Sequence, residues 1–393
     1  MNRDTFHFLR SPAGTNLLAE LSQLTITPHN HLQLAEQLRR RVGPAIAQAA
    51  IETTLLRQQA RPKFSRAGQM FFTRPGLEQA SSETIANYRA GRFAGLRWVA
   101  DWCCGLGGDA IALAAHCQVV GLDLDPLRLW LAQTNVAVYG RDFQAVQANL
   151  LTLPPLSGVE ALFFDPGRRD EHGKRIYDPR AYHPPLNLLE FWRRRIPQAA
   201  AKVSPAIDDR FLPAGAEIEF ISLNGELKEC VLWFGDLRSR GGRRATLLPA
   251  GASLTDEGET DEQLAVVRPG AYLYEPDAAI IRAHLVEKLG RQLAAGKIDP
   301  DIAYLTADQP QPTPFARCFA IEDALPFQLK QLRAYLRQRH IGSVTIKKRG
   351  SPLEPEALRQ QLHLKGDKEA TLFLTHVHGR PFVLVGRPHH LPT

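Results

Sequence analysis

Two aspartates enclose a glycine-rich turn in residues 101–109, DWCCGLGGD, between an apolar run and a helix-like segment. Glycines let the backbone turn tightly and approach a ligand, and the helix start beyond them offers free N–H groups. A dinucleotide site needs G-x-G-x-x-G and an anion at this point, but residue 110 is Ala and Asp109 would repel a pyrophosphate. S-adenosylmethionine instead carries an ammonium and a sulfonium, which carboxylates attract. The pattern therefore predicts a site for this cofactor at Asp101, Cys103, Gly105, Gly107 and Asp109; the alternative is a plain turn with a helix-capping aspartate.

The next two strand-like runs also end in polar residues. Asp123 follows the apolar run at 118–122, where an acid can bind both hydroxyls of a ribose. Asn149 follows the third run, where a polar side chain can meet the adenine amino group. Asp123 could instead be a helix cap, and Asn149 a turn asparagine. Asp125, followed by Pro126 at the first helical position, fits a cap better than a ligand.

A third carboxylate follows the buried run at 159–164, in FFDPGRR. Ligands of a doubly wound sheet gather outside the carboxyl ends of its strands, so Asp165 should lie on the same rim as the earlier acids. We expect Asp165, Arg168 and Lys202 to act in catalysis. Arg169 and Tyr182 belong to a basic and aromatic tract, which we expect to bind substrate. The alternative for this tract is a solvated loop.

The five cysteines form no C-x-x-C pair, which predicts reduced thiols and no metal site. Methylation at C5 of a pyrimidine usually needs a positioned cysteine nucleophile, and none lies in the Asp165 loop. The sequence therefore favours transfer to nitrogen or oxygen.

Alternating apolar runs and helix patterns predict the fold class. Residues 1–95 have helical periodicity, residues 96–269 alternate strand and helix, and residues 270–393 have an α+β pattern. The alternation predicts an α/β, Rossmann-like parallel sheet, and a hairpin turn at Asn224-Gly225 fits a methyltransferase sheet better than an open dinucleotide-binding one. Expected strands are 97–100, 118–122, 159–164, 199–203, 217–223, 227–234, 244–248, 342–347, 370–375 and 382–385; expected helices are 110–116, 126–139, 185–196, 278–293 and 325–339.

Basic residues concentrate near the C-terminus. The net charge is +7, and residues 330–349 hold seven Lys and Arg but no acid. Such a tract favours a polyanionic partner, so we expect Lys347, Lys348 and Arg349 to contact RNA phosphates. The alternative is a solvated surface. The N-terminus has no signal-like apolar run and no stretch is long enough to span a membrane, which predicts a cytoplasmic protein without a membrane partner.

With these motifs assembled, the chain resembles a bacterial family of class I S-adenosylmethionine-dependent methyltransferases that carry a C-terminal THUMP-like domain. Similar segments include DPGRR at 165–169, KVSP at 202–205, NGELKE at 224–229, YEPD at 274–277 and KRG at 348–350. The resemblance implies S-adenosylmethionine as cofactor and an RNA substrate such as tRNA or rRNA. By resemblance alone, residues 71–81 close over the cofactor, with Gln79 among its contacts. The DPGR segment differs from the N/D-P-P-Y/F motif of amino-methylating enzymes, which weakens the case for an exocyclic amine.

Three other functions remain open from the sequence. The protein could methylate a small molecule or another protein, it could be a catalytically silent RNA-binding module, or it could use a nicotinamide cofactor. The basic tract favours RNA over a small molecule, the three acids favour catalysis over a silent module, and the paired acids of the turn argue against nicotinamide.

Overall fold

The computed structural model describes residues 1–27, 29–152, 156–169, 173–258, 260 and 262–390. Its contacts divide the chain into two compact units, residues 1–216 with 231–239, and residues 217–230 with 240–393. The division into residues 1–95, 96–269 and 270–393 stays a prediction. None of the helices described is long and apolar enough to cross a membrane.

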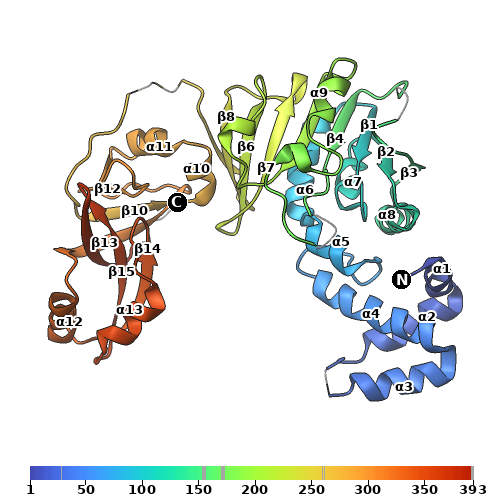
Figure 1. Ribbon diagram of the computed structural model, residues 1–393, viewed down its shortest axis with the longest axis horizontal. Helices are drawn as coiled ribbons and strands as arrows, with labels where there is room; N and C mark the ends of the chain where they lie inside the picture. The colour runs from blue at the N-terminus through green and yellow to red at the C-terminus, as the bar shows by residue number, and fades with distance from the viewer. Residues whose placement is uncertain (28, 153–155, 170–172, 259, 261, 391–393) are drawn as a thin grey trace. The chain divides into compact units, whose positions relative to one another are not determined.

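The first unit begins with helices, as the periodicity predicts (Figure 1). Ser11 starts the second helix by accepting the N–H of Gly14, with Pro12 at the first helical position. Phe6 is buried, and its ring lies parallel to that of Trp130, with centroids 6.4 Å apart. The helical segment therefore packs on the helix that carries Trp130. The elements are α1 (Arg3–Arg10), α2 (Pro12–Ser22), α3 (His31–Val42), α4 (Pro44–Ala60), α5 (Arg74–Gln79), α6 (Glu83–Ala90) and the 3₁₀ turn η1 (Gly91–Phe93).

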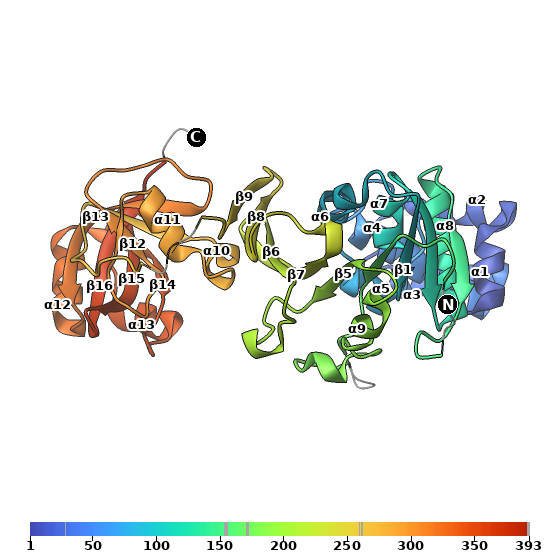
Figure 2. The same ribbon diagram turned by 90° about the horizontal axis from the view of Figure 1, so that it is seen from above.

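A nine-stranded sheet follows, with the order β3-β2-β1-β4-β5-β7-β6-β8-β9. Figure 1 labels β1, β2, β3 and β4 of this sheet, and Figure 2 labels β5 and β9. Its strands are β1 (Trp98–Trp102), β2 (Gln118–Asp123), β3 (Gln144–Gln147), β4 (Ala161–Phe164), β5 (Gln198–Val203), β6 (Glu217–Leu223), β7 (Glu226–Phe234), β8 (Arg243–Leu248) and β9 (Ala252–Thr255). Between and after them lie α7 (Gly108–Leu113), α8 (Pro126–Val138), η2 (Pro179–Ala181), α9 (Leu188–Arg193), η3 (Asp209–Phe211) and η4 (Gly235–Leu237).

The order of the strands indicates which edge of the sheet is expected to bind a ligand. β1 pairs in parallel with β2 on one side and with β4 on the other, so the winding of the chain reverses at β1. A doubly wound sheet opens a crevice at the carboxyl ends of the strands at such a reversal. β4 is buried along its whole length, as expected of a parallel strand covered on both faces. The predicted α/β fold class is confirmed, and the Asp101 and Asp165 positions lie at this edge.

A seven-stranded sheet forms most of the second unit, with the order β11-β12-β10-β13-β16-β15-β14. Its elements are β10 (Tyr272–Pro276), α10 (Ala278–Arg282), α11 (Val286–Gln292), β11 (Gly296–Lys297), β12 (Leu305–Ala307), β13 (Ala316–Pro326), α12 (Leu329–Gln338), β14 (Ile341–Lys348), α13 (Pro355–Leu362), β15 (Lys368–Val377) and β16 (Arg380–Pro388).

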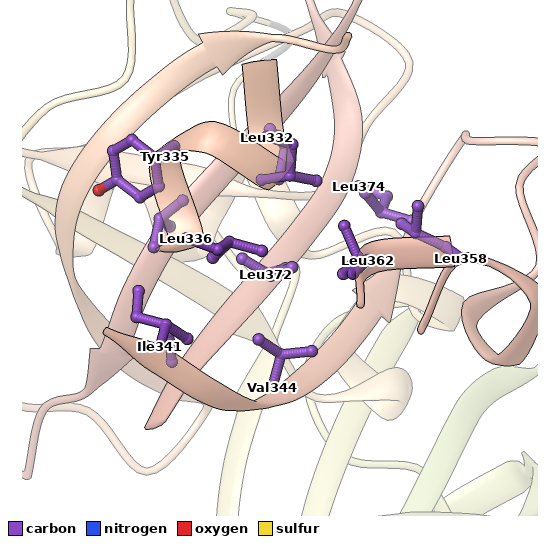
Figure 3. Close-up of a cluster of buried hydrophobic side chains, with 12 residues drawn as sticks. Leu332, Tyr335, Leu336, Ile341, Val344, Leu358, Leu362, Leu372 and Leu374 are labelled. Carbon is purple, nitrogen blue, oxygen red and sulfur yellow. The ribbon is translucent and has the colours of Figure 1, made fainter. Parts of the chain in front are cut away.

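The side chains on the two faces of this sheet belong to two separate hydrophobic clusters. Leu372 and Leu374 of β15 pack with Leu336 of α12 and Leu358 of α13 (Figure 3). Phe373, between the two leucines, belongs to a different cluster on the opposite face. Successive side chains of a strand point to opposite faces, so one strand supplies both cores.

Two helix predictions in this unit are wrong in detail. The single helix expected at 278–293 is two helices, because His284 adopts a left-handed conformation (φ 59°) after α10. The N–H of Leu285 bonds to the carbonyl of Ile280 and that of His284 to the carbonyl of Ile281, which is a Schellman ending. The helix expected at 325–339 begins only at Leu329, because Leu325 and Pro326 belong to β13, which is paired with β16 through residue 326. Residues 327–328 connect the strand to the helix.

Candidate active site

The loop after β1 turns through three residues with positive φ: Cys103 (60°), Gly105 (54°) and Gly107 (79°). A Cβ on Gly107 would lie 2.9 Å from the Cα of Ala132 in α8, so both the conformation and the close approach require glycine there. Cys103 adopts a left-handed conformation although it carries a side chain, which costs on the order of 1 kcal/mol. The tight turn predicted from the glycines is therefore present, with a strained residue at its start.

Asp101, at the fourth residue of β1, is a buried carboxylate. It is 1% exposed, and its Oδ2 has no hydrogen-bond partner among the described residues. Burial raises the pKa of Asp101 well above its ordinary range, and the charges of Asp109, Asp165 and Asp123 raise it further. Four acids thus converge where the strands β1, β2 and β4 end, and this environment favours a cation.

Arg89 of α6 neutralises one member of this acid group. Its guanidinium donates a hydrogen bond to Asp109 and another, of 3.0 Å, to the hydroxyl of Ser81. The guanidinium also lies 5.1 Å from the ring centroid of Phe163 in β4. Arg89 is 2% exposed, so a buried cation holds Asp109 beside the loop. Asp109 therefore has a protein partner, and its contact with the cofactor stays a prediction.

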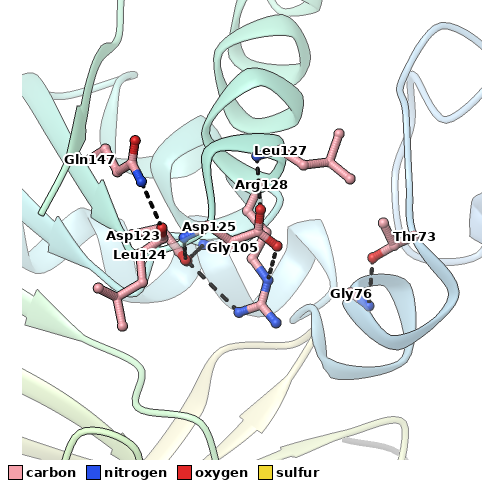
Figure 4. A network of polar contacts seen from close by, with 9 residues as sticks. All are labelled: Thr73, Gly76, Gly105, Asp123, Leu124, Asp125, Leu127, Arg128 and Gln147. Atoms are coloured by element: carbon pink, nitrogen blue, oxygen red, sulfur yellow. Dashed lines mark hydrogen bonds and ion pairs between the residues drawn. The ribbon is translucent and has the colours of Figure 1, made fainter. Parts of the chain in front are cut away.

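Asp123 supports the loop from the end of β2 (Figure 4). One carboxylate oxygen accepts the N–H of Gly105 at 3.1 Å and the other accepts that of Asp125 at 3.0 Å. The nearest guanidinium nitrogen of Arg128 is 4.0 Å away. Each oxygen has two lone pairs, so both can accept a further hydrogen bond. Asp125 caps α8 by accepting the N–H of Leu127 at 2.8 Å, as expected.

Asp165 and Lys202 form an ion pair between the ends of adjacent strands. β4 pairs in parallel with β5, and the Lys202 Nζ donates to Asp165 Oδ2 at 2.5 Å. Lys202 is only 3% exposed, whereas the Asp165 side chain is 22% exposed. The lysine is thus buried beneath the carboxylate, and the carboxylate is the member of the pair that faces the surface.

The backbone after Asp165 is held by a second strand-like segment. Gly167 exchanges two backbone hydrogen bonds with His183, of 2.8 and 3.0 Å. The carbonyl of Arg168 accepts the N–H of Ile176 at 2.8 Å. Arg168 is half-buried, whereas Arg169 is exposed and donates to the carbonyl of Gly173 at 2.9 Å. The roles of Arg168 in catalysis and of Arg169 in substrate binding stay predictions.

The structure places one predicted site residue differently from the expectation and leaves two others open. Tyr182 is 1% exposed, so its ring packs in the core and has no free face on which a base could stack. The side-chain carbonyl of Asn149 accepts the N–H of Leu151 at 3.0 Å, which is the turn alternative. The carbonyl keeps a second lone pair, so its contact with an adenine amino group stays a prediction. Gln79 is exposed at the last residue of α5, and its contact with the cofactor stays a prediction.

Besides Arg89, two positioning residues were not predicted. Asn135 of α8 is fully buried, and its amide exchanges hydrogen bonds of 2.8 and 2.9 Å with the backbone of Phe71 while donating to the carbonyl of Leu106 at 2.9 Å. Lys63 donates to the carbonyls of Leu77 at 2.7 Å and Ala80 at 2.9 Å, at the C-terminal end of α5. Asn135 thus ties the cofactor loop to the segment before α5. A polar residue on the apolar face of α8 was the available signal.

The basic residues at the end of β14 already have partners within the second unit. Lys347 forms an ion pair with Glu275, and Lys348 forms one with Glu354. The guanidinium of Arg349 lies 5.1 Å from the ring centroid of Tyr304. Two of the three charges are therefore partly neutralised, although their local sequence contains no acid. Contact with RNA phosphates stays a prediction.

Within the described residues, no group of three or more His, Cys, Asp or Glu side chains is placed to hold a metal ion.

Three family models match parts of the chain. Residues 96–150 match the model described as RNA cap guanine-N2 methyltransferase, and residues 316–388 match the THUMP domain-like model. Residues 2–60 match a domain of unknown function, DUF8688. The first match covers the Asp101–Asp109 loop and Asp123, and the second covers β13 to β16.

The most informative similarities extend over most of the chain. A solved candidate methyltransferase from Porphyromonas gingivalis W83 has a TM-score of 0.77 with 21% identity, over 96% of this chain and 99% of that one. This likeness supports the fold. Two proteins from Mycobacterium tuberculosis strains CDC 1551 and H37Rv, each named as an uncharacterized S-adenosylmethionine-dependent methyltransferase, are 34% identical over 342 residues, 83% of this chain and 92% of the relative. At this identity and coverage, and with the acid-lined glycine loop at the reversal of the sheet, the chain belongs to this family of S-adenosylmethionine-dependent methyltransferases.

Proposed function

We propose that the protein transfers a methyl group from S-adenosylmethionine to a nitrogen or oxygen atom of an RNA nucleotide, in tRNA or rRNA. The observation that carries the proposal is the unpartnered Oδ2 of Asp101, buried among Asp109, Asp123 and Asp165. A buried carboxylate of this kind is costly unless a cation pairs with it. The ammonium of the cofactor is such a cation, so the residues present fit the cofactor of the family.

Different residues of the chain would bind different parts of the cofactor. Asp101 would pair with the amino end of the methionine, and the free lone pairs of Asp123 would accept the ribose hydroxyls. Arg89 holds Asp109 in place, which leaves the site with less negative charge than four free acids would give. When bound, S-adenosylmethionine supplies an electrophilic methyl group on a sulfonium centre.

Asp165 and Lys202 would act on the acceptor. The buried lysine fixes Asp165 at the end of β4, with one carboxylate oxygen engaged at 2.5 Å. The other oxygen can accept a hydrogen bond from an acceptor N–H or O–H, orient its lone pair and take its proton. Arg168, three residues along the same loop, could bind a phosphate of the substrate.

The cysteines support an acceptor other than C5 of a pyrimidine. Burial raises the pKa of the Cys103 and Cys104 thiols well above their ordinary range, and the neighbouring acids raise it further. Burial also raises the pKa of Cys117 to about 11 and raises that of Cys230 and Cys318. The attacking form of cysteine is the thiolate, and a raised pKa disfavours this form at each of the five cysteines.

The RNA substrate is supported by the second unit and by one family model. The THUMP domain-like match covers residues 316–388, and the methyltransferase model that matches residues 96–150 is named for an RNA substrate. The basic tract at 330–349 is consistent with a polyanionic partner, although two of its lysines have acidic neighbours.

Methyl transfer to RNA tests the proposal directly. Purified protein is incubated with methyl-labelled S-adenosylmethionine and total RNA from a strain that lacks the gene, with RNA from the parent strain as the control. We expect label to enter only the RNA from the deletion strain, and nucleoside mass spectrometry then identifies the modified atom. Calorimetry on the same sample measures cofactor binding.

The alternatives give different results in this experiment. Cofactor binding with label in protein or small molecules, but not in RNA, would indicate another acceptor. RNA binding without cofactor binding would indicate a catalytically silent module. Failure of the folded wild-type protein to bind S-adenosylmethionine would contradict the proposal as a whole.

A further inference from the structure

We infer that a cleft between residues 177–180 and residues 206–211 binds one nucleotide of the substrate strand, next to the nucleotide that is methylated. The inference rests on the proposed function, because it takes the substrate to be RNA. The cleft has a volume of about 560 Å³, within the range of roughly 300–1,000 Å³ that small-ligand sites occupy. Both of its walls belong to the first unit.

The cleft presents planar groups to its ligand. The guanidinium of Arg180 lies 5.1 Å from the ring centroid of Phe211, and that of Arg210 lies 4.9 Å from the same centroid. Tyr177, which also lines the cleft, is 61% exposed. Unstacked bases of single-stranded RNA bind on aromatic rings and on guanidinium planes. Tyr177 is therefore free to stack, unlike Tyr182, which packs in the core.

The charges of the cleft favour a base over a bare anion. Asp178 accepts hydrogen bonds from Arg180, the shortest of 2.7 Å, and Asp208 pairs with Arg210 at 3.2 Å. The hydrogen bond from Arg180 lowers the pKa of Asp178, so the group stays a carboxylate at neutral pH. Two acids beside two arginines leave little net positive charge for inorganic phosphate. They do offer both acceptors and donors, which match the amino groups and ring nitrogens of a base.

The position of the cleft suits a neighbouring nucleotide. Ala206, which lines it, is four residues after Lys202, so their Cα atoms are at most about 15 Å apart. The turn at Ser204, which accepts the N–H of Ala206 at 3.3 Å, shortens this path. On the other wall, the backbone pairing of Gly167 with His183 ties the segment after Tyr177 to the Asp165 loop. A short single strand can bridge the remaining distance.

Binding of a labelled single-stranded oligoribonucleotide to the full-length protein tests the inference. Stacking of a base on an aromatic side chain contributes about 1–3 kcal/mol, so Tyr177→Ala should weaken binding about 5- to 150-fold. Tyr177→Phe keeps the ring and should bind like the wild type. The matched control is Phe191→Ala, since Phe191 is 52% exposed and has the guanidinium of Arg195 5.2 Å from its ring centroid, but does not line the cleft.

Each outcome decides the inference. Loss of binding in Tyr177→Ala alone, together with an ultraviolet cross-link from the oligoribonucleotide to Tyr177 or Phe211, would support it. Equal binding of Tyr177→Ala and wild type, with wild-type methyl transfer to RNA intact, would overturn it and leave the proposed function standing. Competition by inorganic phosphate as strong as that by a nucleoside monophosphate would show a simple anion site and also overturn it. If the wild type neither binds nor methylates RNA, the proposed function fails and the inference fails with it.

Discussion

Replacing Asp101 with Asn should stabilise the protein without cofactor and abolish tight binding of S-adenosylmethionine. Asp101 is 1% exposed, its Oδ2 has no hydrogen-bond partner among the described residues, and three other acids surround it. In Asp101→Asn the charge is gone, and the amide N–H groups can donate to the remaining carboxylates. The variant should therefore remove the repulsion between Asp101 and the neighbouring carboxylates. It should also lack the carboxylate that pairs with the ammonium of the cofactor.

The size of the stabilisation has a ceiling that does not depend on the folded-state pKa. A buried acid can avoid its charge by binding a proton. At pH 7 this protonation costs about 1.4 kcal/mol for each unit by which the pH exceeds the ordinary pKa of the acid. The ordinary pKa is 3.8, so the gap is about 3 units and the penalty is at most about 4 kcal/mol. The midpoint of thermal unfolding should rise by about 2–4 °C per kcal/mol recovered. Loss of the pair with the ammonium should weaken cofactor binding by about 100-fold or more.

The pH dependence separates this cause from a general packing effect. The folded-state pKa of Asp101 is raised, so its contribution to stability is fully present below the ordinary pKa and is lost as the pH rises through the folded-state value. The stability difference between Asp101→Asn and wild type should therefore grow with pH over this window and level off above it. Urea unfolding of both proteins at several pH values, without cofactor, measures the difference, and calorimetry measures cofactor affinity. A variant that is equally destabilised at every pH and still binds the cofactor would refute the reasoning.

Three further changes have defined outcomes. Asp123→Ala leaves the ribose hydroxyls without an acceptor and frees the N–H of the loop, so calorimetry should show cofactor affinity reduced by about 1–3 kcal/mol; unchanged affinity would contradict the ribose role. Asp165→Asn keeps the shape above the buried lysine, so methyl transfer should be lost while cofactor affinity stays within a few-fold; a parallel loss of affinity would place Asp165 in the cofactor site instead. Joint replacement of Lys347, Lys348 and Arg349 by Ala should reduce the slope of log K for RNA binding against log salt concentration by about one unit. The reduction is about one unit rather than three because two of the charges have acidic partners. An unchanged slope would exclude this surface as an RNA contact.

The parallel sheet was predictable because its strands are short apolar runs that each end in a polar residue. Burial on both faces requires apolar residues at every position, so β1, β2 and β4 are evident without any alternation. The helix break after α10 was not predictable in the same way. A Schellman ending usually has glycine in the left-handed position, but here the residue is His284, and no composition signal marks it. The start of α12 was misjudged because pairing with β16, and not local propensity, determines where β13 ends.

The acids of the site were predictable from topology, but their partners were not. Parallel strands bring their carboxyl ends to one edge, so Asp101, Asp123 and Asp165 could be grouped from sequence position alone. Arg89 lies on a helix before the first strand, and its pairing with Asp109 depends on how α6 packs. Sequence periodicity does not contain that information. The buried position of Tyr182 depends on packing in the same way. The sequence pattern does not distinguish an aromatic residue that stacks on a base from one that fills a core.

The last third of the helical segment before the sheet contacts the glycine-rich loop of residues 101–109. Arg89 balances the charge of Asp109, and Gly76 of α5 approaches the loop so closely that a Cβ there would lie 2.7 Å from the Leu106 side chain. Asn135 then holds the carbonyl of Leu106 and the backbone of Phe71 together in a buried hydrogen-bond group. Without Arg89, four carboxylates would lie close together at the reversal of the sheet, and Asp109 would lack the cation that pairs with it. The residues that position this loop and offset its acids therefore come from α5, α6 and α8, outside the strands β1, β2 and β4.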